Sequence, residues 1–274
     1  AINASQPGDV IQVAAGNFVE SLSVAVPNLT IQGAGAALTI IKTIGTTPAV
    51  RLYSNGFTMK NLQITNNSQM KEGIRVLSPA TMGMTLDGVY FTKIANGNDN
   101  AFAINIPVSF SNLAVKNCQF TATLASSRAM AVYSGKNLTQ TNWLFENNLF
   151  QYLYTGIYMN SSVNGISLAG NNFGPWDISD CKQAAAGLYI GDGGSTFTIQ
   201  NVSVTGNTFN SYARGVYFLN NVAGGVIGAT EVRNNIFTNS IWSSGVRLVA
   251  GTDGYGVYLP SVLAFAALVV LVAG

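Results

Sequence analysis

Two short segments recur along nearly the whole sequence, and this repetition limits the fold more than any other feature. The first segment reads apolar–x–(Asn/Gly)–x–x–Phe, with copies at 86–91, 115–120, 145–150, 168–173, 204–209 and 232–237, and an earlier copy at 59–64 that ends in Ile. The second segment reads small–apolar–x–apolar, and its first apolar residues are Val50, Ile74, Ile104, Val132, Ile157, Leu188, Val216 and Val246. Successive copies of the second segment lie between 24 residues (Val50 to Ile74) and 31 residues (Ile157 to Leu188) apart.

Each repeat predicts two or three short strands, because apolar and polar residues alternate and Asn or Gly marks the turns. Strands that return at a long, fixed period are typical of a solenoid, in which each coil buries its apolar positions against the next. We therefore expect an all-β parallel β-helix of about 8–9 coils over residues 1–253, with neighbouring coils about 4.8 Å apart. The apolar residues of the second segment should form one buried row, the Phe residues should stack, and the Asn residues should satisfy turns. A β-sandwich, the alternative, predicts hairpins and no long-period repeat.

The composition removes several classes of function. Charged residues make up 9% of the chain, where roughly 25% is usual, and a net charge of +2 provides no basic stripe for nucleic acid. The chain has no His, which excludes Ser-His-Asp and Cys-His catalysis and His-based metal sites. Its 2 Cys cannot form a four-thiolate zinc site. We expect no metal site of these kinds, and the abundance of Asn, Ser, Thr, Gly and Ala favours an extracellular protein.

The opening of the chain resembles the first coil of the pectin-lyase-like right-handed parallel β-helix superfamily. The matching residues are Pro-Gly-Asp-Val-Ile-Gln-Val at 7–13, Ala-Gly-Asn-Phe-Val-Glu at 15–20 and Leu-Thr-Ile-Gln-Gly at 29–33. With the later coils, the resemblance covers about residues 1–250 and implies a right-handed helix. Members usually begin with a short capping helix, and this chain starts inside it at Ala1 without Met, which favours an N-terminus processed after a secretion signal, or a truncated one.

The resemblance implies no single function, because the fold hosts lyases, hydrolases, esterases, epimerases, phage spikes and surface proteins. The motifs of four enzyme classes are missing: the W-I-D-H element of pectate lyases, the G-H-G motif of polygalacturonases, the Q-A-V-A-L and D-F-I-F-G motifs of pectin methylesterases, and the D-P-H motif of epimerases. Glu20 alone matches the first-coil Glu of the methylesterases. The resemblance therefore favours a generic, non-enzymatic member.

Three carboxylates are weak catalytic candidates. Asp177, Asp180 and Asp192 fall in the long gap between Phe173 and Phe209, which indicates an inserted loop, and Lys182 lies near them in the sequence. Converging carboxylates could cleave a glycosidic bond or hold Ca²⁺. Acidic residues also simply solvate protruding loops, and this is the interpretation that we favour. No other cofactor is expected.

The residue between the two apolar positions of the second segment should point outward, because side chains alternate along a strand. These residues are Arg51, Arg75, Asn105, Tyr133, Tyr158, Tyr189, Tyr217 and Arg247. The four consecutive Tyr and the three Arg predict a binding face, since exposed aromatic rows bind sugar rings or another protein with little loss of entropy. The alternative is an ordinary strand face on which Tyr residues stack on one another. Both interpretations stay open at this point.

Cysteine and asparagine chemistry adds two further predictions. Cys118 and Cys181 are a candidate disulfide, although bridging requires Cα atoms within about 7 Å and two coils span about 9.6 Å, so the loop would have to fold back. Sequons for N-glycosylation occur at Asn3, Asn28, Asn66, Asn137, Asn160 and Asn201.

Residues 254–274 form an uncharged, hydrophobic tail of 21 residues. This length suits a membrane-spanning helix, which needs about 20 residues, but the tail could equally dock into a neighbouring molecule or cap the last coil. The sequence thus favours an extracellular structural or adhesive surface protein, the β-helix subunit of a surface layer, a filament or a viral appendage, anchored to a membrane or to its own copies through residues 254–274. The alternative is a polysaccharide-binding or polysaccharide-processing β-helix protein.

Overall fold

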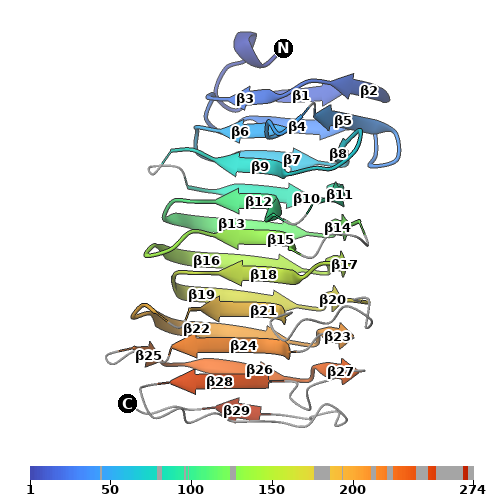
Figure 1. The fold of residues 1–274 in the computed structure, drawn as a ribbon. Coiled ribbons are helices and arrows are strands. Elements are labelled where there is room, and N and C mark those ends of the chain that lie inside the picture. Colours follow the sequence, from blue (N-terminus) through green and yellow to red (C-terminus); the bar gives the residue numbers. More distant parts are fainter. Residues whose placement is uncertain are drawn as a thin grey trace.

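The computed structural model describes residues 1–43, 45–78, 82–95, 97, 99–123, 128–175, 186–192, 194–210, 214–220, 225–238, 246–250 and 268–270. A short 3₁₀ helix, η1 (Ile2–Ala4), precedes a column of strands stacked from the N-terminal end to the C-terminal end (Figure 1). Each coil contributes one strand to each of three sheets, which we name A, B and C in the order in which the chain passes through them.

The three sheets contain nearly all the regular structure of the described residues. Sheet A runs β1 (Val10–Val13), β4 (Thr30–Gly33), β7 (Phe57–Lys60), β10 (Met84–Asp87), β13 (Phe110–Lys116), β16 (Thr139–Glu146), β19 (Ser162–Ala169), β22 (Thr198–Thr205), β26 (Thr230–Arg233) and β29 (Leu268–Val270), with β25 (Val226–Ile227) also on β22. Sheet B runs β2 (Gly16–Val19), β5 (Thr39–Thr43), β8 (Gln63–Asn66), β11 (Tyr90–Ile94), β14 (Gln119–Ala122), β17 (Leu149–Gln151), β20 (Asn172–Phe173), β23 (Thr208–Asn210) and β27 (Ile236–Thr238). Sheet C runs β3 (Leu22–Val24), β6 (Val50–Leu52), β9 (Glu72–Val76), β12 (Ala101–Ile106), β15 (Ala129–Ser134), β18 (Thr155–Met159), β21 (Ala186–Gly191), β24 (Arg214–Asn220) and β28 (Val246–Ala250).

The predicted buried row of sheet C is confirmed. Its members pair in register from coil to coil as Val50–Ile74–Ile104–Val132–Ile157–Leu188–Val216–Val246. All these pairings are parallel, and the seven side chains from Val50 to Val216 are fully buried. The chain therefore has the predicted right-handed parallel β-helix fold, and the sandwich alternative is wrong.

A continuous stack of phenylalanine rings fills the interior beside sheet B. Phe91, Phe120, Phe150, Phe173, Phe209 and Phe237 are buried, with successive ring centroids 4.4–5.1 Å apart and ring planes within 2–9° of each other. The centroid distance matches the strand spacing because each ring comes from the same position of consecutive coils. The predicted Phe stacking is thus confirmed.

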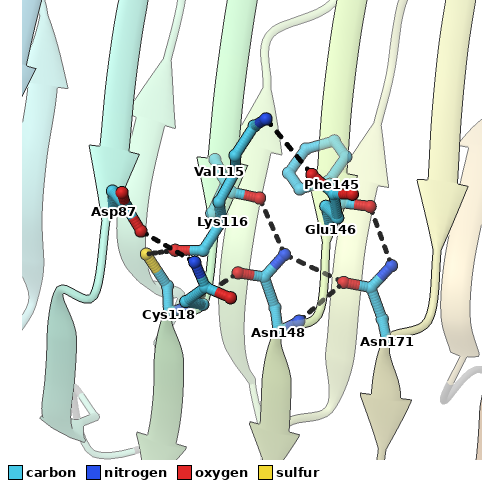
Figure 2. A network of polar contacts seen from close by, with 9 residues as sticks. Asp87, Val115, Lys116, Cys118, Phe145, Glu146, Asn148 and Asn171 are labelled. Carbon is cyan, nitrogen blue, oxygen red and sulfur yellow. Dashed lines mark hydrogen bonds and ion pairs between the residues drawn. The ribbon is translucent and has the colours of Figure 1, made fainter.

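A ladder of buried asparagines lies in the turn between sheets A and B, one position after the Asn or Gly of the first segment. Asn148 donates from its backbone N–H and its Nδ2 to Oδ1 of Asn171, at 3.0 and 2.8 Å (Figure 2). Asn171 repeats both bonds to Asn207 at 2.9 and 2.9 Å, and Asn207 repeats them to Asn235 at 2.8 and 3.0 Å. Each amide also donates to a carbonyl of the preceding coil, such as Val115 for Asn148. The ladder therefore satisfies turn groups that would otherwise be buried without partners.

The end of the tail belongs to the solenoid. β29 pairs with β26 in antiparallel register, Thr230 with Val270 and Val232 with Leu268. Every other strand pairing described is parallel, so β29 enters sheet A from the opposite direction and covers the exposed edge of its last coil strand. In the described part of the chain, no helix has the length and apolar character needed to cross a membrane.

Candidate functional site on the outer face of sheet C

One outward row of sheet C carries the residues of the predicted binding face. The strand register aligns Arg51, Arg75, Asn105, Tyr133, Tyr158, Tyr189, Tyr217 and Arg247, one residue per coil. The side chain of Arg247 lies outside the part that the structure describes. Strands β12, β15, β18, β21 and β24 stack one below another (Figure 1), so the row continues from each coil to the next. Tyr217 belongs to a small hydrophobic cluster separate from the main core, which places the tyrosines outside the coil, although Tyr217 is only 7% exposed.

The aromatic rings of this row stack on one another. Ring centroids lie 4.7 Å apart from Phe102 to Tyr133, from Tyr158 to Tyr189 and from Tyr189 to Tyr217, with interplanar angles of 22–28°. The pair Tyr133–Tyr158 differs, with centroids 5.7 Å apart and an edge-to-face angle of 61°. Most ring faces are therefore covered by neighbouring rings, and the row offers ring edges and hydroxyl groups to a ligand.

Three residues of this face were missed by the sequence analysis. Glu72, Phe102 and Arg214 each stand immediately before the small residue of the second segment, and strict alternation assigns no outward position to them. The ladder pairs Phe102 with Glu72 and then Ile104 with Ile74, and it skips the small residue between them. This irregularity places the residue before the small one on the outer side, where the Arg214 guanidinium lies 4.5 Å from the Tyr217 ring centroid. The skipped pairing has no signature in the sequence.

The end of the row that precedes the rings is polar. Glu72, 6% exposed, accepts hydrogen bonds from Arg75 Nη1 at 3.2 Å and from Asn105 Nδ2 at 3.0 Å. Arg51 occupies the next position of the row beside Arg75. With Arg214 at the opposite end, cationic groups flank the ring stack on both sides.

Burial raises the pKa of three tyrosines of the row, Tyr133, Tyr158 and Tyr189, so their hydroxyls stay protonated. Burial, and then the neighbouring Tyr133 and Asp192, raise the pKa of Tyr158 to about 12. Burial likewise raises the pKa of Tyr189, with further contributions from Tyr158 and Tyr217, and burial raises the pKa of Tyr133. At neutral pH these phenols can donate hydrogen bonds but cannot act as bases.

Asp192 is the one predicted carboxylate candidate that the structure describes, and it is engaged. Its Oδ2 lies 3.0 Å from Lys136 Nζ, and its Oδ1 accepts a hydrogen bond from Gly194 N–H at 2.7 Å. Burial raises the pKa of Asp192, but these two contacts outweigh burial and hold the pKa below its usual range. Asp177, Asp180 and Lys182 lie outside the described residues. Within the part of the chain that is described, no group of three or more metal-ligating side chains comes together.

The cysteine and sequon predictions are partly corrected. Cys118 is a free, buried thiol whose Sγ donates to the Lys116 carbonyl, so the candidate disulfide is not formed; Cys181 lies outside the described residues. Asn66 is unsuited to glycosylation, because it is 4% exposed and its Nδ2 donates to Thr43 Oγ1 at 2.7 Å. Asn3, Asn28, Asn137 and Asn201 are exposed and Asn160 is partly buried, so their use as sequons stays a prediction.

Comparisons with known proteins add little to this geometry. No protein-family model matches the sequence, and no curated protein matches it. Among solved structures, the fold is similar to that of the A-module of mannuronan C-5 epimerase AlgE4 from Azotobacter vinelandii. The two share 13% sequence identity with a TM-score of 0.33, over 87% of this chain and 72% of that chain. Similarity at this level carries no information about activity.

Proposed function

We propose that this protein is an extracellular adhesive β-helix protein that binds a polysaccharide along the outer face of sheet C and does not cleave it. The observation that carries this proposal is the row of Tyr133, Tyr158, Tyr189 and Tyr217, extended by the ring of Phe102 that stacks on Tyr133 and flanked by Arg75 and Arg214. A linear polymer can follow such a row across several coils. Aromatic rings held in place by stacking lose little conformational entropy when they bind.

The geometry also indicates how the ligand would be held. Ring faces are largely occupied by neighbouring rings, so binding would depend on the phenolic hydroxyls, the ring edges and the flanking guanidinium groups. Protonated phenols suit this role, because they donate hydrogen bonds to the oxygen atoms of a sugar. Binding without cleavage fits the described ionisable groups, since Asp192 and Glu72 are both paired with cations and the raised pKa values of Tyr133, Tyr158 and Tyr189 keep these phenols neutral.

The tail enters this proposal as a cap. Among its three predicted roles, the pairing of β29 with β26 favours closure of the last coil over a membrane anchor or a docking segment.

The proposal is tested by measuring the affinity of the purified protein for a panel of immobilised acidic and neutral polysaccharides. The double variant Tyr158→Phe, Tyr189→Phe keeps the ring stack and removes two hydroxyls. We expect it to bind about tenfold more weakly, which corresponds to about 1.4 kcal/mol. Tyr90→Phe is the matched control, because Tyr90 is exposed on the outer face of sheet B. Shortening of the polysaccharide during incubation, or equal binding by the double variant, would overturn the proposal.

A further inference from the structure

The polar end of the sheet C row contains hydrogen-bonding atoms that lack partners. Arg51, Arg75 and Asn105 occupy consecutive positions of the row, so they are separated by one strand spacing, about 4.8 Å, at each step. The Nε atoms of both arginines and Oδ1 of Asn105 are buried and make no hydrogen bond. Buried polar atoms in folded proteins nearly always have a partner, so three neighbouring exceptions call for an explanation.

The orientation of the Asn105 amide is fixed by Glu72. Asn105 is only 6% exposed, and its Nδ2 donates to Glu72 Oε1 at 3.0 Å. This bond leaves Oδ1 as the free end of the amide, an acceptor that needs a hydrogen-bond donor from elsewhere. The unpartnered atoms thus consist of two cationic donors and one neutral acceptor.

The charges at this end are also incompletely balanced. Two arginines at facing positions of adjacent strands repel each other. Glu72 compensates Arg75, with Oε1 3.2 Å from Nη1, but Arg51 forms no ion pair with any described residue. A bound anion between the two guanidinium groups would remove this repulsion.

We propose that Arg51, Arg75 and Asn105 form a binding site for a phosphate group. Phosphate oxygens accept hydrogen bonds from the guanidinium groups, and Arg is well suited to bind them. A hydrogen phosphate also carries a P–OH group, and this group can donate to Asn105 Oδ1. The Arg75 side chain is 41% exposed, so its guanidinium group can turn toward the ligand. The site shares Arg75 with the proposed polysaccharide face but includes none of the tyrosines.

The experiment is calorimetric titration of the full chain with inorganic phosphate and, separately, with sulfate at the same ionic strength and neutral pH. Sulfate has a similar size but no hydroxyl to donate to Asn105. We expect phosphate to bind at least fivefold more tightly than sulfate, and Arg51→Gln to weaken phosphate binding at least tenfold. Asn105→Asp, which places a carboxylate against the anion, should abolish it.

Arg233→Gln is the matched control, because Arg233 lies on sheet A, paired with Glu231. Equal binding of phosphate and sulfate, unchanged binding by Arg51→Gln, or an equal loss in Arg233→Gln would overturn the site. Arg51→Lys keeps the positive charge and serves as a second variant in case Arg51→Gln fails to fold. If Arg51→Lys has the circular dichroism spectrum of the natural protein and binds phosphate more weakly, the result supports a guanidinium site. If Arg51→Lys binds phosphate fully, the result overturns the site. Titration with a hexose 6-phosphate and with the same unphosphorylated hexose distinguishes a phosphorylated glycan from free phosphate as the source.

Discussion

At the scale of single residues, the small residue of the second segment is explained by the phenylalanine stack. A Cβ atom added to Gly156 would lie 2.7 Å from Cδ1 of Phe173 and 2.6 Å from the Gly187 carbonyl oxygen. The sequence shows that only Gly or Ala occupies this position. It does not show which side chain requires a small residue there, because the partner ring comes from a later segment of the chain and another sheet. Gly73 and Gly187 show the same contact, with Phe91 and Phe209, so the small residue of one coil packs against the Phe of the next coil.

Gly156→Ala should destabilise the protein by about 1–3 kcal/mol, because the new methyl group overpacks a stack that is closed on both sides. Urea unfolding followed by circular dichroism measures the change. Gly194→Ala is the control, since the nearest atom to its added Cβ is 3.8 Å away. Equal stability of Gly156→Ala and the natural protein would mean that the stack can shift to admit a methyl group.

At the scale of elements, ladders of identical side chains connect one coil to the next. The Asn ladder runs through buried turns, and the tyrosine row runs along the outside of sheet C. Cys118 occupies the ladder position in its coil, and its backbone N–H donates to Asn148 Oδ1 at 2.9 Å (Figure 2). The ladder thus begins at Asn148 and continues toward the C-terminal end.

Removal of one rung of the Asn ladder should be costly. Asn148→Ala leaves the Cys118 N–H and the Val115 carbonyl without their side-chain partner in a buried turn. At about 1–3 kcal/mol for each unsatisfied group, we expect a loss of about 3 kcal/mol or more in the free energy of unfolding. Asn172→Ala, at an exposed position on sheet B, should change it by less than about 0.5 kcal/mol. Similar losses for the two variants would show that the ladder is not a special source of stability.

The tyrosine row predicts a loss of stability at alkaline pH. The phenol of Tyr158 has a pKa of about 12 in the folded protein and about 10 when unfolded. Above pH 10 the unfolded chain therefore holds fewer protons than the folded one, so stability is complete below pH 10 and falls as the pH rises toward 12. Tyr158→Phe should flatten this decline when thermal unfolding is recorded from pH 8 to 11.5. An unchanged slope would contradict the assignment of Tyr158 to a stacked, partly buried row.

At the scale of the whole molecule, the repeat predicted the fold because one coil specifies the next. The period, the alternation and the Asn turns were enough for the parallel solenoid, the buried row and the Phe stack. Only part of the site could be predicted. Alternation placed Tyr158 and its neighbours on one face, but it could not give the orientation of the rings, which depends on the spacing between coils. The Lys136–Asp192 ion pair joins two coils with another between them, and no local pattern encodes such a contact.

The central claim, that the outer face of sheet C binds a polysaccharide, is tested most directly by hydroxyl-radical footprinting. Tyrosine oxidation is measured by mass spectrometry with and without a saturating amount of the polysaccharide that binds most tightly in the panel. We predict that Tyr133, Tyr158 and Tyr189 become protected, whereas Tyr90, on sheet B, is oxidised equally in both samples. Protection of Tyr90 with unchanged oxidation of the sheet C tyrosines would contradict the claim.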